Sequence, residues 1–208
     1  PLILAFQAKD TLYIPFIGPL NIGLLYLPLI PIGVSAASNL TNMLAGFNGL
    51  EAGMGAVACV AMALAALILH RPEATIITLP LAAALLAFLK YNWYPAKIFP
   101  GDTGTLIIGA AIATAAIVGG LEIIGALLLA PHIIDFVLKA STRRPFAQRA
   151  TYGDTKVKPD GTLQPPPYPA LPHVFMRAAD INEPSLVKAL IAMQALYAAI
   201  AIAIATLG

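Results

Sequence analysis

Charged side chains are scarce in this sequence, and four long stretches contain none. Of its 208 residues, 11% are charged and 59% are hydrophobic, whereas a soluble domain carries about 25% charged residues. An uncharged run of about 18 residues can cross roughly 30 Å of hydrocarbon as a helix that satisfies its own backbone hydrogen bonds. Four such runs leave too little polar surface for a soluble protein. The uncharged stretches are 11–50, 52–69, 103–121 and 189–208.

Cysteine is also nearly absent, and no signal peptide is visible. The single Cys59 lies in an apolar stretch, which excludes a disulfide framework. The chain opens at Pro1, without a methionine, and is apolar from there to Ala8. We expect this opening to be the end of a truncated helix, and residues 1–208 to be one transmembrane domain from the C-terminal two-thirds of a longer chain.

The hydrophobic pattern predicts an all-α, polytopic transmembrane helical bundle with about six full spans plus the truncated N-terminal helix. A sixth, interrupted span covers about 121–139 and contains Pro131 and Asp135. The polar segment 140–184 is predicted to be a loop with one hairpin around Asp160-Gly161. The five complete spans are predicted at 18–37, 52–69, 74–90, 103–120 and 189–207.

The basic residues indicate which side of the membrane each loop occupies. Alternating spans place 38–51, 91–102 and 140–188 on one side, and that side receives ten of the twelve lysines and arginines. Only Lys9 and Arg71 fall on the other. This asymmetry predicts that the first side is cytoplasmic.

An asparagine-rich cluster, Ser38 to Glu51, lies between two predicted spans on that side. Amides and carboxylates are costly in hydrocarbon, so they pair, cap a helix or line a wet cavity. The simpler alternative is that Asn48-Gly49 forms a turn and Glu51 stabilises the start of the next helix. The sequence alone favours this turn.

Asp102 opens a predicted span directly after Pro100-Gly101. Mg²⁺ takes one or two carboxylates and completes its octahedron with phosphate oxygens and water, so Asp102 is a candidate ligand. A helix N-cap is an equally good explanation at this stage.

A basic cluster follows the sixth span: Lys139, Arg143, Arg144 and Arg149. Arginine side chains match phosphate oxygens geometrically. Anionic lipid headgroups attract the same kind of cluster at a membrane interface.

Two motifs resemble those of the polyprenyl-phosphate N-acetylhexosamine-1-phosphate transferases, within the glycosyltransferase family 4-like proteins. The likeness is greatest to the archaeal and eukaryotic UDP-GlcNAc:dolichyl-phosphate GlcNAc-1-phosphate transferases. The bacterial peptidoglycan branch has an aspartate-rich first motif, which is a poorer match. The matching residues are Asn39-x-x-Asn42-x-Leu44-Ala45-Gly46-x-Asn48-Gly49-Leu50-Glu51-Ala52-Gly53, then Asn92-Trp93-Tyr94-Pro95 and Phe99-x-Gly101-Asp102-Thr103.

The resemblance implies a Mg²⁺-dependent transfer of GlcNAc-1-phosphate, or a related N-acetylhexosamine-1-phosphate, from a UDP-sugar to polyprenyl or dolichyl phosphate. UMP is released. Asn42 and Asp102 would hold the metal and take part in catalysis, and the segment Ser35–Met43 would lie along the acceptor.

The remaining substrate contacts are also implied by the resemblance. Phe99 and Gly46 would contact the faces of uracil, and Asn48 would form hydrogen bonds to it. Arg144 and Arg149 would hold the pyrophosphate and sugar, although this loop departs from the arginine-histidine-arginine cluster of the eukaryotic branch.

The family also has an aspartate pair, upstream of these motifs, that is implicated in activating the acceptor phosphate. No Asp-Asp pair occurs in these 208 residues. We therefore expect residues 1–208 alone to be inactive.

The implied partners are the UDP-sugar, the lipid phosphate and membrane lipid, with no nucleic acid; a homodimer is left open. The protein would lie in the plasma membrane of a prokaryote or the endoplasmic reticulum of a eukaryote, with its active face cytoplasmic.

A membrane transporter or channel is the alternative of a different class. Asp135, Glu122 and Glu51 would then line a polar path across the bilayer. Polar residues gathered at one face favour the transferase, and Asp135 is expected to pair with Lys139, four residues further on.

Overall fold

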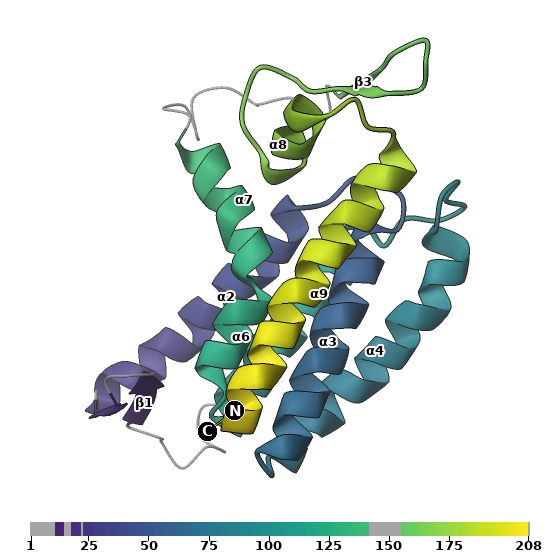
Figure 1. The fold of residues 1–208 in the computed structure, drawn as a ribbon. Helices are drawn as coiled ribbons and strands as arrows, with labels where there is room; N and C mark the ends of the chain where they lie inside the picture. The colour runs from purple at the N-terminus through teal and green to yellow at the C-terminus, as the bar shows by residue number, and fades with distance from the viewer. Residues whose placement is uncertain (1–10, 15–17, 22, 142–154, 208) are drawn as a thin grey trace.

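The computed structural model describes residues 11–14, 18–21, 23–141 and 155–207, and it is an α-helical bundle (Figure 1). Within these residues, five helical segments are long and apolar enough to cross a membrane. The prediction of a polytopic transmembrane bundle is thereby confirmed. The five are α2 (Tyr26–Met43) with the preceding 3₁₀ turn η1 (Gly23–Leu25), α3 (Leu50–Ile68), α4 (Pro72–Asn92), α5 (Gly101–Gly119) and α9 (Glu183–Leu207).

The interrupted span is also confirmed. Helices α6 (Glu122–Leu128) and α7 (Ala130–Ala140) pass the same test only as a pair, bent by 61°. Pro131 lies in the first turn of α7, where its missing N–H is tolerated. The carbonyl of Leu128, at the bend, accepts a hydrogen bond of 3.0 Å from Nε2 of the fully buried Gln194. This contact satisfies a backbone group that lipid could not.

The predicted start of the first span, at residue 18, was wrong. Thr11–Ile14 (β1) and Gly18–Asn21 (β2) form an antiparallel hairpin, and helix begins only at Gly23. A lack of charge distinguishes apolar from polar segments, but it does not distinguish a helix from a short hairpin.

The predicted end of that span, at residue 37, was wrong as well. Helix α2 continues to Met43 and so includes the first part of the asparagine-rich cluster, Ser38 to Met43. Ser38 Oγ donates to Val34 O at 2.9 Å, and Asn39 Nδ2 donates to Ser35 O at 2.8 Å. These side chains bond to the preceding turn of their own helix, so their polarity does not end it.

The polar loop contains the predicted hairpin and a helix that the sequence did not predict. Strands β3 (Lys156–Val157) and β4 (Leu163–Gln164) pair around Asp160-Gly161. The additional helix is α8 (Leu171–Ala178). Helix α9 then begins at Glu183 instead of the predicted residue 189.

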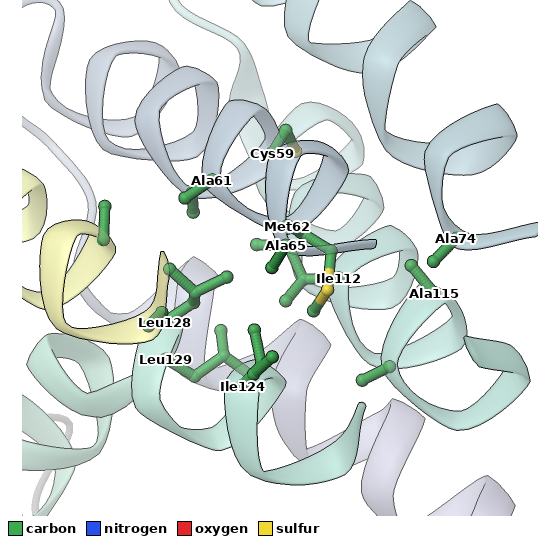
Figure 2. Close-up of a cluster of buried hydrophobic side chains, with 14 of the residues drawn as sticks. Cys59, Ala61, Met62, Ala65, Ala74, Ile112, Ala115, Ile124, Leu128 and Leu129 are labelled. Atoms are coloured by element: carbon green, nitrogen blue, oxygen red, sulfur yellow. The ribbon is translucent and has the colours of Figure 1, made fainter. Parts of the chain in front are cut away.

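Small side chains fill the middle of the bundle. Figure 2 shows Met62, Ile112 and Leu128 meeting there among alanines, and all three are fully buried. Close helix contact in membranes depends on such small residues. A Cβ added to Gly109 of α5 would lie 2.2 Å from the carbonyl oxygen of Ala37 in α2. Gly109 therefore permits the close approach of α2 and α5 on which the candidate site depends.

Candidate active site

The two motifs meet at one end of the bundle. The α2–α3 loop, the α4–α5 loop and the start of α9 lie at this end, together with α8 and β3 (Figure 1). Side-chain contacts described below join several of these segments, which are far apart in the sequence.

Asn42 and the first turn of α5 are joined through Thr105. The hydroxyl of Thr41 lies 2.8 Å from the backbone carbonyl of Thr105 and 2.9 Å from that of Ser38, and its single proton is donated to one of them at a time. The hydroxyl of Thr105 lies 2.6 Å from Asn42 Oδ1 and 3.0 Å from the carbonyl of Asp102, and its single proton serves one of these at a time. The contact brings the turn of α2 that carries Asn42 against the turn of α5 that carries Asp102.

These two residues offer the oxygen donors that Mg²⁺ prefers. Asp102 is exposed in the first turn of α5, and Asn42 is half-buried. Among the described residues, no group of three or more His, Cys, Asp or Glu side chains is placed to hold a metal. One carboxylate and one amide fit a Mg²⁺ ion that takes its other ligands from substrate phosphates and water.

Asn48 links three segments of the chain. Its Oδ1 accepts a hydrogen bond from the backbone N–H of Ala96 at 2.7 Å. Its backbone N–H donates to Oε1 of Glu183 at 2.7 Å, and its Nδ2 donates a second, short bond to the same oxygen. The expected turn at Asn48-Gly49 is present, with Gly49 at φ 80°. The side chain of Asn48, however, does more than form a turn, because it holds the loop to two other segments.

Gly46 and Phe99 lie on the two loops that Asn48 joins. Gly46 has a φ of 113°, which favours glycine, and a Cβ there would meet nothing within 4 Å. Phe99 is 49% exposed, so an aromatic face is open to a ligand. The structure thus brings together the segments carrying Asn42, Gly46, Asn48, Phe99 and Asp102. Arg144 and Arg149 lie outside the described residues.

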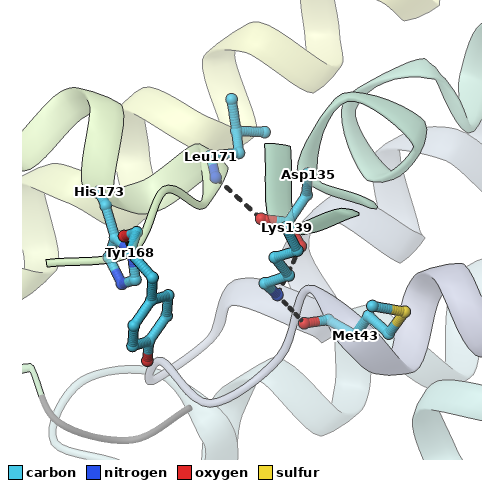
Figure 3. A network of polar contacts seen from close by, with 6 residues as sticks. All are labelled: Met43, Asp135, Lys139, Tyr168, Leu171 and His173. Atoms are coloured by element: carbon cyan, nitrogen blue, oxygen red, sulfur yellow. Dashed lines mark hydrogen bonds and ion pairs between the residues drawn. The ribbon is translucent and has the colours of Figure 1, made fainter. Parts of the chain in front are cut away.

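Asp135 and Lys139 form the predicted ion pair, at 2.6 Å (Figure 3). Asp135 is fully buried, and its Oδ1 also accepts the backbone N–H of Leu171 at 2.8 Å. Lys139 Nζ donates to the carbonyl of Met43, the last residue of α2, at 2.5 Å. The pair therefore joins α7 to α8 and to the end of α2, beside Asn42.

His173 was missed by the sequence reasoning. It is buried on α8, where its Nδ1 lies 3.0 Å from the carbonyl of Tyr168 and its ring contacts the Tyr168 ring edge-to-face (Figure 3). Because a carbonyl only accepts, Nδ1 carries the hydrogen and Nε2 is the acceptor nitrogen of the neutral ring. Burial lowers the pKa of His173, and the nearby charges of Arg177 and Lys139 lower it further. His173 belongs to neither of the two motifs, although its partner Tyr168 is only five residues away.

An apolar groove of about 270 Å³ runs beside α2, between α5, α6 and α7. Tyr26 and Glu122 are its polar members, and the Tyr26 hydroxyl donates to Glu122 Oε1 at 2.6 Å. Glu51 and Asp135 are not part of its lining. This groove therefore does not connect the three acidic residues of the transporter alternative.

Sequence comparisons find known proteins that match this chain over most of its length. A protein of Saccharolobus solfataricus, provisionally named UDP-N-acetylglucosamine–dolichyl-phosphate N-acetylglucosaminephosphotransferase, is 37% identical over 99% of this chain and 64% of its own length. A protein of the same provisional name from Sulfolobus acidocaldarius is 36% identical over 99% of this chain and 62% of its own. The phospho-N-acetylmuramoyl-pentapeptide-transferase of Clostridium botulinum is 35% identical over 64% of this chain and 44% of its own.

The extent of these matches settles the family. The chain spans just under two thirds of the length of the two archaeal relatives. The sequence profile of glycosyl transferase family 4 matches residues 1–120, more than half of the chain. Both findings confirm the resemblance drawn from the two motifs: this chain belongs to glycosyl transferase family 4.

Proposed function

We propose that this chain is part of a membrane enzyme that transfers GlcNAc-1-phosphate, or a related N-acetylhexosamine-1-phosphate, from a UDP-sugar to polyprenyl or dolichyl phosphate. One observation carries the proposal. Asn42 of the first motif lies 2.6 Å from the hydroxyl of Thr105, 63 residues further on and one helical turn after Asp102 of the second motif. This contact lies at the end of α2, and the side of α2 lines an apolar groove. A sugar-nucleotide site beside a groove for an apolar chain is what this reaction requires.

The groove supports the choice of a lipid acceptor. Its α2 lining runs from Tyr26 to Leu40, a rise of about 21 Å along the helix. Leu40 lies half a turn before Asn42. An isoprenoid chain lying in this groove would bring its phosphate to the polar end of α2, in agreement with the role expected for Ser35–Met43.

In the proposed reaction, an oxygen of the lipid phosphate attacks the β-phosphorus of the UDP-sugar and UMP leaves. Asn42 and Asp102 would hold Mg²⁺, which supplies charge neutralisation on the pyrophosphate when bound. Thr105 orients the Asn42 amide from its place one turn into α5. Gly46, Asn48 and Phe99 would bind uracil, and Lys139 fixes the end of α2.

The polar end is proposed to face the cytoplasm, because the basic residues gather on its loops. UDP-sugars made in the cytosol would then reach the site directly, while the acceptor stays in the bilayer.

A transfer assay tests the proposal. Membranes containing the full-length protein, radiolabelled UDP-GlcNAc and a polyprenyl phosphate should yield a labelled lipid and UMP when Mg²⁺ is present. Omitting the acceptor or chelating Mg²⁺ should abolish the product. Labelled GlcNAc that appears without phosphate on the lipid would exclude phosphosugar transfer.

A further inference from the structure

Glu183 holds the side-chain amide of Asn48 in a single orientation. Its Oε1 accepts hydrogen bonds from both the backbone N–H and the Nδ2 of Asn48, while Asn48 Oδ1 accepts the N–H of Ala96. A carboxylate only accepts and a backbone N–H only donates. Turning the amide over would therefore set Nδ2 against the N–H of Ala96 and Oδ1 against Glu183. The assignment of nitrogen and oxygen in this amide follows from its partners.

The fixed amide has two hydrogen-bonding positions left for a ligand. An amide has two hydrogens on nitrogen and two lone pairs on oxygen. Among the described residues, Glu183 and Ala96 use one of each. One donor and one acceptor remain, in a set order, on a loop that also carries Gly46.

The same segment is held from a second side. Oε1 of Glu51, in the first turn of α3, accepts the backbone N–H of Gly46 at 2.6 Å. Glu183 occupies the corresponding first turn of α9. Carboxylates are favourable in the first turn of a helix, because the helix dipole is positive at its N-terminus. Two carboxylates from two helices thus fix both ends of Gly46–Asn48, so the loop segment that carries the amide is held in place.

An amide of fixed orientation can distinguish two pyrimidines. Uracil presents the N3–H donor beside the O4 acceptor, whereas cytosine presents the N3 acceptor beside an amino donor. In one and the same pose, uracil would meet the complementary groups of the Asn48 amide, whereas cytosine would set donor against donor and acceptor against acceptor. A site with hydrogen-bonding groups strongly rejects a ligand that leaves them unpaired. We infer that Glu183 is a specificity-determining positioning residue, which makes the site prefer uracil over cytosine by fixing the Asn48 amide. The inference rests on the proposed function, in which Asn48 contacts the base.

The first test compares the affinities of UMP and CMP for the full-length protein in the presence of Mg²⁺. Glu183→Ala removes the acceptor, so UMP affinity should fall about 2- to 15-fold and the UMP-to-CMP ratio should fall with it. Glu183→Gln retains an acceptor oxygen and should keep the ratio within about 3-fold of wild type. The matched control is Glu73→Ala, at the other end of α4, which should change neither value. An unchanged ratio in Glu183→Ala, or an equal loss in Glu183→Gln, would overturn the inference.

A second test separates folding from recognition. Asn48→Asp sets two carboxylates against each other, so the unfolding temperature should fall. Adding Glu183→Gln supplies an N–H to the new carboxylate and should restore that temperature. The uracil preference should stay lost, because a carboxylate has no N–H to offer the base. If the double variant keeps the wild-type ratio, the amide does not read the base and the inference is wrong.

The inference and the proposed function fail in different ways. A wild-type protein that neither transfers phosphosugar nor binds UMP would contradict the proposed function. A wild-type protein that transfers phosphosugar and prefers UMP, with the preference unaffected by Glu183→Ala, would contradict the inference alone.

Discussion

In the middle of the bundle α3 meets its neighbours through alanine, glycine and methionine, whereas at the polar end the helices and loops are joined by side-chain hydrogen bonds. The span of α3 is 72% buried and that of α2 only 11%. Packing in the middle sets how closely two helices approach. Polar contacts at the end then determine which loops meet. The comparison predicts that buried contacts, both in the middle of the bundle and at its polar end, determine the stability of the fold. Exposed polar side chains at the polar end would determine the transfer activity.

The largest effect on stability is expected from Asp135→Asn, which breaks a buried ion pair at the polar end. The change leaves the Lys139 ammonium without its carboxylate and should cost about 3–5 kcal/mol. Asp180→Asn is the matched control, because Asp180 pairs with Lys158 at 2.8 Å but is 78% exposed. That exposed pair should contribute little to stability, because solvent screens it. Thermal unfolding in detergent measures the stability of both variants. Equal losses of stability would show that burial does not determine how much each ion pair contributes.

Asp102→Asn is expected to affect chemistry without affecting stability. The side chain is exposed, so the unfolding temperature should stay the same. Losing one charged group that stabilises the transition state should lower the transfer rate about 10²- to 10³-fold. Asp160→Asn, on the exposed β3–β4 hairpin, is the control and should retain full activity. Near-normal turnover of Asp102→Asn at limiting Mg²⁺ would show that Asp102 does not hold the metal.

Gly109→Ala tests the middle of the bundle. The added methyl would overlap the Ala37 carbonyl and force α2 from α5, at a cost of about 1–3 kcal/mol. Activity should fall as well, since the contacts of Thr41 and Thr105 depend on that approach. Gly33→Ala, also in the membrane, adds a methyl with no atom within 4 Å and should leave the unfolding temperature unchanged. If both variants unfold at the wild-type temperature, close packing does not set the distance between these helices.

Asn48→Ala should have a smaller effect on binding. Losing the proposed contacts with uracil should raise the Kd for the UDP-sugar about 2- to 15-fold. Isothermal titration of the full-length protein with UMP measures this change, and thermal unfolding shows whether the loop junction survives. An unchanged affinity in a folded variant would leave Asn48 with only its structural contacts.

The smallest effect concerns pH. Because the folded protein lowers the pKa of His173 below the ordinary 6.5, the unfolded chain binds the proton more readily. Stability should therefore decline as the pH falls below about 6.5, and His173→Gln should reduce that decline. The exposed His70→Gln is the control. An identical decline in the His173→Gln variant would assign the acid sensitivity to other groups.

Local sequence signals predicted much of this fold. Uncharged runs identified the spans, Pro131 marked the bent one, and the spacing of Asp135 and Lys139 predicted their ion pair. These features depend on residues close together in the chain. Helix α8 has no uncharged run or long apolar stripe, so nothing local indicated it.

The site was predicted only in part, because its contacts cross long sequence distances. The motif residues Asn42 and Asp102 were identified through the family resemblance, and the structure brings their helix turns together. The bond from Asn48 to Glu183 joins residues 135 positions apart, and no spacing rule connects them. The start of the first span was misplaced because an apolar hairpin and an apolar helix have the same composition.

The bend between α6 and α7 has a consequence for the thickness of the bilayer around the protein. The two helices have seven and eleven residues, and the pair is bent by 61°, so it reaches about 25 Å from end to end. The hydrocarbon layer of a typical bilayer is about 30 Å thick. The bent pair therefore spans less than this thickness, and thinning of the lipid beside it would make up the difference. Headgroups drawn inward at this point would lower a lipid phosphate toward Lys139 and the end of α2.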